Sequence, residues 1–298
     1  MFSVSRRFKR LLSMNYQMAR KLAYGEYKRS IDESKEPLIV FQMGKVGSST
    51  IVDSLEHHCL DMEIFHIHVL SHEWIEHVHQ LYKNASNIHK KTIIDKHILA
   101  SQYLRETLDK QQANSQLKVV TLTRDPVARN ISAFFQAFPI HFPETYIKHK
   151  EKNIPLEERV EELIDLFLHK FDKHDVPVNW FENHIKPAFD TDVYASEFDP
   201  LKGYKIYDSP RAEILLLRLE DLTKCGKDAF DKFLGIPHFE IKNKNVSSEK
   251  KYSEEYALFK KGANLPEPYV ERMYESQYMK HFYSKEERQK LRAKWLNS

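Results

Sequence analysis

The amino-acid sequence predicts an α/β fold in which helices flank a central, mostly parallel β-sheet and continue as a helical C-terminal extension. Three mostly apolar runs, at residues 37–42, 117–123 and 212–219, have the character of strands that are covered on both faces. Segments with helical periodicity separate these runs, and such alternation is typical of parallel sheets. The end of the chain, from about residue 241 to 298, is charged, aromatic-rich and mostly helical in pattern.

The remaining elements are predicted from local pattern. We expect further strands at residues 61–70, 92–95 and 192–194. We expect helices at residues 50–59, 99–112, 127–138, 156–189 with a break near Pro177, and 222–234. Parallel sheets bind ligands at the carboxyl ends of their strands, so the segments that follow residues 42, 95 and 123 are the first candidates for a site.

Size and composition indicate an ordinary globular protein. With 298 residues, 41% hydrophobic and 30% charged, the chain suits one α/β domain at residues 37–298 behind a basic helical lead-in at residues 1–36. A net charge of +3 is too small to indicate a nucleic-acid partner, so we expect none. Cys59 and Cys225 make no disulfide framework and suit a reducing compartment, so we expect a cytoplasmic protein.

The basic N-terminus has two interpretations. It lacks the apolar run of about 18 residues that a transmembrane helix needs, and it lacks a signal-peptide core. It is either a solvated helical lead-in or a peripheral contact with an anionic membrane surface, in this case the inner face. The second interpretation depends on Arg6, Arg7, Lys9 and Arg10.

A candidate anion-binding loop follows the first predicted strand, where residues 42–50 read Gln-Met-Gly-Lys-Val-Gly-Ser-Ser-Thr. The two glycines allow a close approach of the backbone, and the following amides lead into a helix N-terminus, which favours an anion. Lys45 precedes the second glycine, whereas a Walker loop places its lysine after it, so this is not a Walker loop. For the string alone, a plain turn is the alternative. The candidate ligand-binding residues are Gly44, Lys45, Val46, Gly47, Ser48, Ser49 and Thr50.

A second candidate phosphate motif follows the strand predicted at residues 117–123. Arg124 stands at its end, and Ser132 follows eight residues later in the next predicted helix. The guanidinium of Arg124 offers a planar set of donors to a phosphate. Ser132 lies about two helical turns further on and can present a hydroxyl to the same oxygens. Taken singly, Arg124 and Asp125 could instead form a surface ion pair, with Ser132 as a small packing residue.

Together these motifs resemble those of sulfotransferases that use 3′-phosphoadenosine 5′-phosphosulfate (PAPS). The first loop is similar to their 5′-phosphosulfate loop, Pro-Lys-x-Gly-Thr-Thr, with Gly44 in place of the proline. Residues 122–135 resemble their 3′-phosphate motif. With the Trp180 segment and residues 269–284, the chain resembles bacterial capsular polysaccharide synthesis proteins of sulfotransferase type. The likeness spans most of residues 37–298, and it is specific at the two phosphate motifs and loose elsewhere.

The resemblance implies a P-loop-like three-layer fold and PAPS as the sulfuryl donor, with no metal. It implies that Lys45 contacts the bridging oxygen and assists the leaving group, and that Arg124 and Ser132 hold the 3′-phosphate. A hydroxyl acceptor on a polysaccharide or other glycan is the expected partner. Two alternatives are a nucleotide-dependent kinase, which would need a carboxylate pair for Mg²⁺, and a non-catalytic scaffold of glycan biosynthesis that retains the fold.

Sulfuryl transfer also needs a base for the acceptor hydroxyl, and histidine suits neutral pH. His97 is the first candidate, because it follows the strand predicted at residues 92–95 and some branches of the family carry a histidine in a similar place. His66 and His68 are the rivals, and a carboxylate is a further alternative. Asp95 either orients His97 or caps the next helix. Trp180 either belongs to the core or stacks on a sugar ring.

Overall fold

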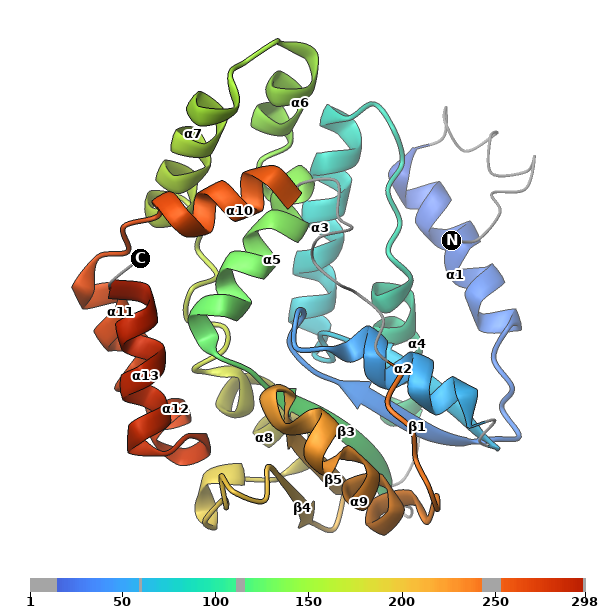
Figure 1. Ribbon diagram of the computed structural model, residues 1–298. Coiled ribbons are helices and arrows are strands. Elements are labelled where there is room, and N and C mark those ends of the chain that lie inside the picture. The colour runs from blue at the N-terminus through green and yellow to red at the C-terminus, as the bar shows by residue number, and fades with distance from the viewer. Residues whose placement is uncertain (1–14, 59–60, 111–115, 243–252, 297–298) are drawn as a thin grey trace.

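The central sheet has the strand order β2-β1-β3-β5-β4 (Figure 1). The computed structural model describes residues 15–58, 61–110, 116–242 and 253–296. Its strands are β1 (Glu36–Phe41), β2 (Met62–Ile67), β3 (Leu117–Thr123), β4 (Tyr204–Asp208) and β5 (Ala212–Arg218). Neighbouring strands pair in parallel except β4, which pairs antiparallel with β5 at the edge. The predicted α/β class with a mostly parallel sheet is therefore confirmed.

Helices surround this sheet and extend from it, and Figure 1 shows α2 and α9 in front of it, with α3, α5, α6, α7 and α10 gathered above. The helices are α1 (Tyr16–Arg29), α2 (Ser48–His57), α3 (His72–Ile88), α4 (Lys96–Lys110), α5 (Pro126–His141), α6 (Pro143–Glu151), α7 (Leu156–His169), α8 (Lys186–Phe189), α9 (Leu222–Leu234), α10 (Ser253–Gly262), α11 (Glu267–Tyr274), α12 (Gln277–Phe282) and α13 (Lys285–Leu296). None of the described helices has the length and apolarity that a membrane crossing requires.

Two predicted strands are wrong for a local reason. At residues 92–95 the chain is a loop, because the N–H of Ile93 donates to the hydroxyl of Ser86 at 2.9 Å instead of to a strand. Near residue 192 the carboxylate of Asp192 accepts the N–H of Tyr194 at 2.9 Å, and a 3₁₀ turn follows at Val193–Ala195. Side-chain acceptors of this kind compete with a sheet for backbone donors.

Other differences concern elements that the pattern did not predict. The edge strand β4 and the long helix α3 were missed, and β4 lacks the regular alternation of apolar and polar residues that would have indicated a strand. The helix expected at residues 156–189 ends at His169 and resumes as a π-helical turn at Phe181–Ile185 followed by α8.

The lead-in is not fully solvated in its described part, because α1 buries Tyr16, Ala19 and Ala23. Residues 1–14, which include the predicted membrane-contact cations, lie outside the described residues, as does Cys59; Cys225 is buried.

The order of the strands predicts a ligand crevice at the carboxyl ends of β1 and β3. The chain leaves β1 towards its neighbour β2, whereas it leaves β3 towards β5 on the opposite side. Such a reversal of direction between adjacent parallel strands leaves a gap in which ligands of open α/β sheets bind. The loop after β1 and the residues after β3 are the two predicted phosphate motifs, so the topology places them beside one another.

Candidate functional site

The loop between β1 and α2 has an unusual backbone. Lys45 has φ 77° and Gly47 has φ 91°, both in the left-handed region. A Cβ atom on Gly47 would lie 2.6 Å from Cδ1 of Leu219, whereas a Cβ on Gly44 would have no heavy atom within 4 Å. The left-handed φ therefore favours glycine at position 47, where a Cβ would also require the side chain of Leu219 to shift, and neither argument applies to position 44.

The loop ends at the N-terminus of α2, where Ser48 is buried, Ser49 exposed and Thr50 half-buried. First-turn amides of a helix have no carbonyl partner within the helix. No side chain in the described part of the chain caps α2 at Gly47. The aligned peptide dipoles and these amides favour an anion at this helix end.

Two arginines hold the loop from the side of β3 and α5. Nη1 of Arg124 donates to the carbonyl oxygen of Lys45 at 2.7 Å. Nε of Arg129 donates to the carbonyl oxygen of Gly44 at 3.0 Å. Burial lowers the pKa of Arg129 to about 10, so this guanidinium remains charged at neutral pH. Arg129 was not predicted as a site residue; its position five residues after Arg124, in the first turn of the following helix, was the available signal.

The surface ion pair considered for Arg124 and Asp125 is wrong, because Asp125 is buried. Its carboxylate accepts the hydroxyl of Tyr274 at 2.7 Å and the indole N–H of Trp295 at 3.3 Å. It also accepts the N–H of Val127 at 3.1 Å and so caps α5. Asp125 is thus a structural residue that fixes the start of α5, and Arg124 remains available to the crevice.

Side chains from the C-terminal helices complete the surroundings of Arg124 and Ser132. Burial raises the pKa of Tyr256, while the charge of Arg124 and a hydrogen bond with Ser132 act against that rise. Burial lowers the pKa of Lys260, as do the charges of Lys294 and Arg124. Arg124 and Lys294 thus act electrostatically on Lys260, and Tyr256 and Ser132 are hydrogen-bonded to each other. The sequence analysis missed Tyr256, Lys260 and Lys294, because no motif links them to Arg124.

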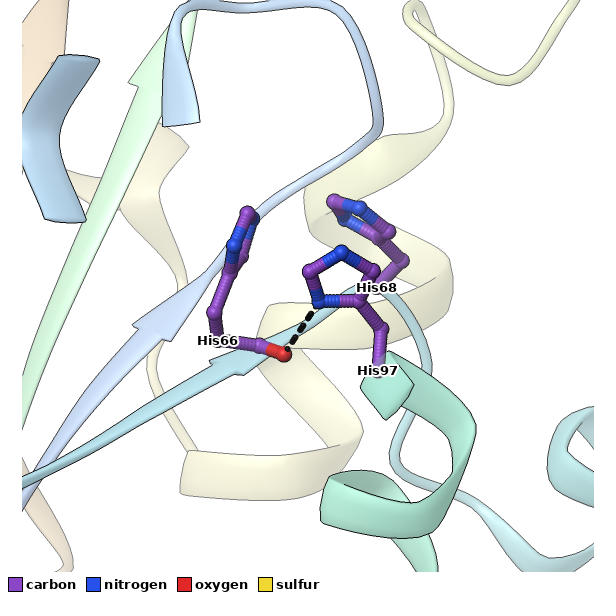
Figure 2. A group of neighbouring side chains, drawn as sticks. All are labelled: His66, His68 and His97. Carbon is purple, nitrogen blue, oxygen red and sulfur yellow. Dashed lines mark hydrogen bonds between the residues drawn. The ribbon is translucent and has the colours of Figure 1, made fainter. Parts of the chain in front are cut away.

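Three histidines form a compact cluster beside the loop (Figure 2). The ring centroids of His66 and His97 are 4.2 Å apart, and each lies 4.9 Å from the ring of His68. His66 is in β2, His68 follows β2, and His97 is in the first turn of α4. The prediction treated His97 and the other pair as rivals; the structure instead brings all three together.

The hydrogen bonds of the cluster determine its tautomers. Nδ1 of His68 donates to the carbonyl oxygen of Gln42 at 2.7 Å, and Nδ1 of His97 donates to the carbonyl oxygen of His66 at 2.9 Å. A carbonyl oxygen can only accept, so both Nδ1 atoms carry the proton and both Nε2 atoms have a lone pair when the rings are neutral. Burial lowers the pKa of His66 to about 2 and of His68 to about 4, and the neighbouring histidines add to both shifts.

Asp95 and Trp180 each resolve an alternative left open by the sequence. The carboxylate of Asp95 accepts the backbone N–H of His97 at 2.7 Å and the hydroxyl of Tyr82 at 2.6 Å, so it caps α4 and contacts no ring nitrogen of His97. Trp180 is buried and packs edge-on against Phe41, with a ring-centroid distance of 5.3 Å. Asp95 therefore acts as a helix cap, and Trp180 packs in the core while it also lines the cavity described next.

A cavity of about 1110 Å³ opens on the loop and on the histidine cluster. Its lining includes Gly44, Lys45, His68, His97 and Arg129. The rest of its wall comes largely from α3, α5 and the segment around the π-helical turn, and it carries many aromatic and histidine side chains. Arg124 and Ser132 are not part of this lining. Lys45 thus lines the cavity, and its carbonyl oxygen also accepts the hydrogen bond from Arg124, which lies outside the lining.

Comparisons with known proteins concern the C-terminal part of the chain. No curated protein and no solved structure matches this sequence. A protein-family model described as "Putative capsular polysaccharide synthesis protein" matches residues 151–284. The matched segment begins at the end of α6 and runs through α12, beyond the loop, the histidine cluster and Arg124. The match indicates glycan biosynthesis as the general area in which this protein acts.

Proposed function

We propose that this protein is a sulfotransferase that moves a sulfuryl group from PAPS to a hydroxyl of a glycan. The observation that carries the proposal is the contact between the two phosphate motifs, in which Arg124 donates to the carbonyl oxygen of Lys45 at 2.7 Å. This contact joins a helix N-terminus to a guanidinium at the crevice between β1 and β3. A nucleotide that carries phosphate at its 3′ and 5′ positions matches two such anion sites.

In this proposal the 5′-phosphosulfate binds to the loop amides and to the hydroxyls of Ser48, Ser49 and Thr50. The 3′-phosphate binds between Arg124 and Ser132. Lys260 and Lys294 add positive charge there, which is supported by the effect of both Arg124 and Lys294 on the pKa of Lys260. Tyr256 adds a hydroxyl beside Ser132. The donor site would therefore combine residues from both ends of the chain.

The reaction proceeds by in-line displacement at sulfur. The acceptor oxygen forms a bond to sulfur while the bond from sulfur to the bridging oxygen of PAPS breaks, and the electron pair of that bond remains on the phosphate. Lys45 stabilises the negative charge that develops on the departing oxygen. Nε2 of His97 has the lone pair needed to accept the proton of the hydroxyl, because its Nδ1 donates to the carbonyl of His66.

The acceptor would enter through the cavity, because Lys45 and His97 both line it. Its volume of about 1110 Å³ suits a ligand of one to a few sugar rings. The family match over residues 151–284 supports a glycan as the acceptor class, and this segment supplies part of the cavity wall.

Calorimetry with adenosine 3′,5′-bisphosphate tests the donor site. We expect the wild-type protein to bind this ligand and Arg124→Gln to bind at least about tenfold more weakly, because a charged hydrogen-bond donor is lost. The matched control is Arg211→Gln, which removes an exposed arginine away from the site. Failure of the wild-type protein to bind would overturn the proposal, and tighter binding of Mg²⁺-ATP than of the bisphosphate would favour a kinase.

Transfer of sulfuryl from PAPS to glycan fragments tests the chemistry. We expect Lys45→Met to lose most of the transfer rate while it retains binding of adenosine 3′,5′-bisphosphate, because that ligand lacks the sulfuryl group. Lys227→Met, at an exposed position on α9, is the control. Bisphosphate binding without transfer to any glycan fragment would instead indicate a scaffold that retains the nucleotide site.

A further inference from the structure

We infer that His66, His68 and His97 form a zinc site with a fourth coordination position open to the cavity. One ring nitrogen from each histidine lies within 4.8 Å of those of the other two, and Figure 2 shows the three rings gathered from β2, the segment after it and the start of α4. Three imidazoles and one exchangeable position are the ligand set of many catalytic zinc sites. The sequence spacing places His66 and His68 on one strand face but did not indicate a third ligand, because His97 comes from a different element.

The backbone around the cluster supplies the outer partners that metal-binding histidines usually have. Nδ1 of His68 donates to the carbonyl of Gln42, and Nδ1 of His97 donates to the carbonyl of His66, at 2.7 and 2.9 Å. A ligating histidine commonly donates its other ring N–H to a carbonyl or carboxylate, which fixes both the tautomer and the ring plane. The lone pairs of both Nε2 atoms are therefore available for a metal before one binds.

The environment of His66 is a separate argument for a bound metal. Nε2 of His66 is inaccessible to solvent and has no hydrogen-bond partner among the described residues. A buried ring nitrogen without a partner costs about 1–3 kcal/mol. Neighbouring rings at centroid distances of 4.2 and 4.9 Å surround it, and neither pairs with it. Coordination to a metal held between the three rings would satisfy this atom.

The geometry requires only small adjustments. Zinc–nitrogen bonds of about 2.1 Å in a tetrahedral site place the nitrogens about 3.4 Å apart. The separations here are within 4.8 Å, so rotations of the side chains that move each nitrogen by roughly 1 Å would suffice. His68 and His97 line the cavity, so the fourth position would face its interior.

The charges around the cluster indicate what the fourth ligand would be. Lys96 and Arg129 lie near enough to affect the histidines electrostatically, and Asp95 opposes them near His68. A dication beside two cations and one carboxylate favours a fourth ligand that carries negative charge. Hydroxide, or the ionised hydroxyl of a bound sugar, meets this requirement, because a zinc ion strongly lowers the pKa of the oxygen that it binds.

This role of the metal rests on the proposed sulfuryl transfer, whereas the metal site itself does not. With zinc bound, the lone pair on Nε2 of His97 is occupied and that ring can no longer accept the proton. The acceptor hydroxyl would then lose its proton to water in the cavity, and its oxygen would attack sulfur. Zinc coordination and base catalysis by His97 are therefore alternatives that metal removal can separate.

The site is tested with tag-free protein that has been stripped by a chelator and then titrated with Zn²⁺. We expect close to one zinc per chain by calorimetry. The single variants His66→Gln, His68→Gln and His97→Gln should each lose at least about tenfold in affinity. The matched control is His77→Gln, an exposed histidine that lines the same cavity but lies outside the cluster. Co²⁺ in place of zinc should give the strong visible absorption of a four- or five-coordinate ion.

Several outcomes would overturn the assignment. These are the absence of stoichiometric zinc binding by the wild type, unchanged affinity in the triple variant, and a purely six-coordinate Co²⁺ spectrum. Binding of adenosine 3′,5′-bisphosphate is measured on the same samples, with circular dichroism as the check of folding. Zinc bound without nucleotide binding would support the metal site and reject the sulfotransferase. Nucleotide binding without zinc binding would reject the metal site and support the donor site of the proposed sulfotransferase.

Discussion

At the scale of single residues, the backbone of the loop distinguishes two glycines that look equivalent in the sequence. Gly47 has a left-handed φ and lies against Leu219, whereas Gly44 has open space around it. Lys45 also has a left-handed φ, which for a residue with a side chain costs about 1–2 kcal/mol. Strain of this size persists where neighbours hold it, and here Arg124 and Arg129 bind the loop carbonyls.

We predict that Gly47→Ala lowers the free energy of unfolding by about 2–3 kcal/mol. The added methyl group brings backbone strain and a contact of 2.6 Å with Leu219. Gly44→Ala is the matched control and should change stability by less than about 0.5 kcal/mol. Urea unfolding of the three proteins measures both values. Equal losses at the two positions would contradict this account of the loop.

At the scale of elements, α1 is attached to the domain by polar contacts. The hydroxyl of Tyr16 lies 3.3 Å from Nδ1 of His79 in α3, and Arg20 pairs with Glu76 at 3.1 Å. Burial lowers the pKa of His79 to about 4, and the charge of Arg20 adds to this shift while Glu76 opposes it. The contact of α1 with α3 is therefore made by a neutral histidine.

The pH dependence of stability should report this histidine. Its pKa is about 4 in the folded state and about 6.5 in the unfolded state, so the unfolded chain binds more protons between these values. The contribution of His79 is complete above pH 6.5 and decreases as the pH falls towards 4. From pH 6.5 to 5 the loss is about 2 kcal/mol.

The variant His79→Gln isolates this effect. The difference in unfolding free energy between wild type and His79→Gln should decrease by about 2 kcal/mol from pH 7 to pH 5. His77→Gln, an exposed position on the same helix, should show the wild-type pH profile. Denaturant unfolding at several pH values measures both. Parallel profiles for wild type and His79→Gln would show that His79 is not the titrating group.

At the scale of the whole molecule, the C-terminal helices reach back to the start of α5. The hydroxyl of Tyr278 in α12 accepts the N–H of Arg124 at 2.8 Å and donates to its carbonyl at 2.9 Å. Asp125 receives bonds from Tyr274 in α11 and Trp295 in α13. The last three helices thus position the residue that we assign to the 3′-phosphate.

Tyr278→Phe should therefore affect stability and ligand binding together. Loss of the hydroxyl leaves a buried N–H and C=O without their partner, so we expect about 1–3 kcal/mol lower stability and weaker binding of adenosine 3′,5′-bisphosphate. Tyr207→Phe is the matched control, because the buried hydroxyl of Tyr207 has no partner among the described residues. Its removal should leave both quantities unchanged or raise stability slightly. Thermal unfolding and calorimetry compare the two variants.

The sequence was informative where local pattern and physical requirement coincide. The runs that became β1, β3 and β5 are mostly apolar because both faces of these strands are largely buried. The helix α9 has the predicted bounds of residues 222–234. The short stretches near residues 92 and 192 were wrong because side chains of Ser86 and Asp192 take the backbone donors. Such competition depends on a few atoms and leaves no mark on hydropathy.

The candidate site also has some features that follow from local sequence and others that follow from tertiary contacts. A glycine- and serine-rich turn before a helix, and an arginine at a strand end, are local features, and the sequence alone was enough to select Lys45, Gly47 and Arg124. Three further features depend on contacts between residues far apart in the chain. Arg124 binds the loop, Tyr256 and Lys260 are close enough to Arg124 to interact with it, and the three histidines of the cluster come together from separate parts of the chain. The sequence therefore determined the strand–loop–helix unit to which we assign an anion. Tertiary structure decided what surrounds it, because only the packing of distant elements brings those side chains within reach.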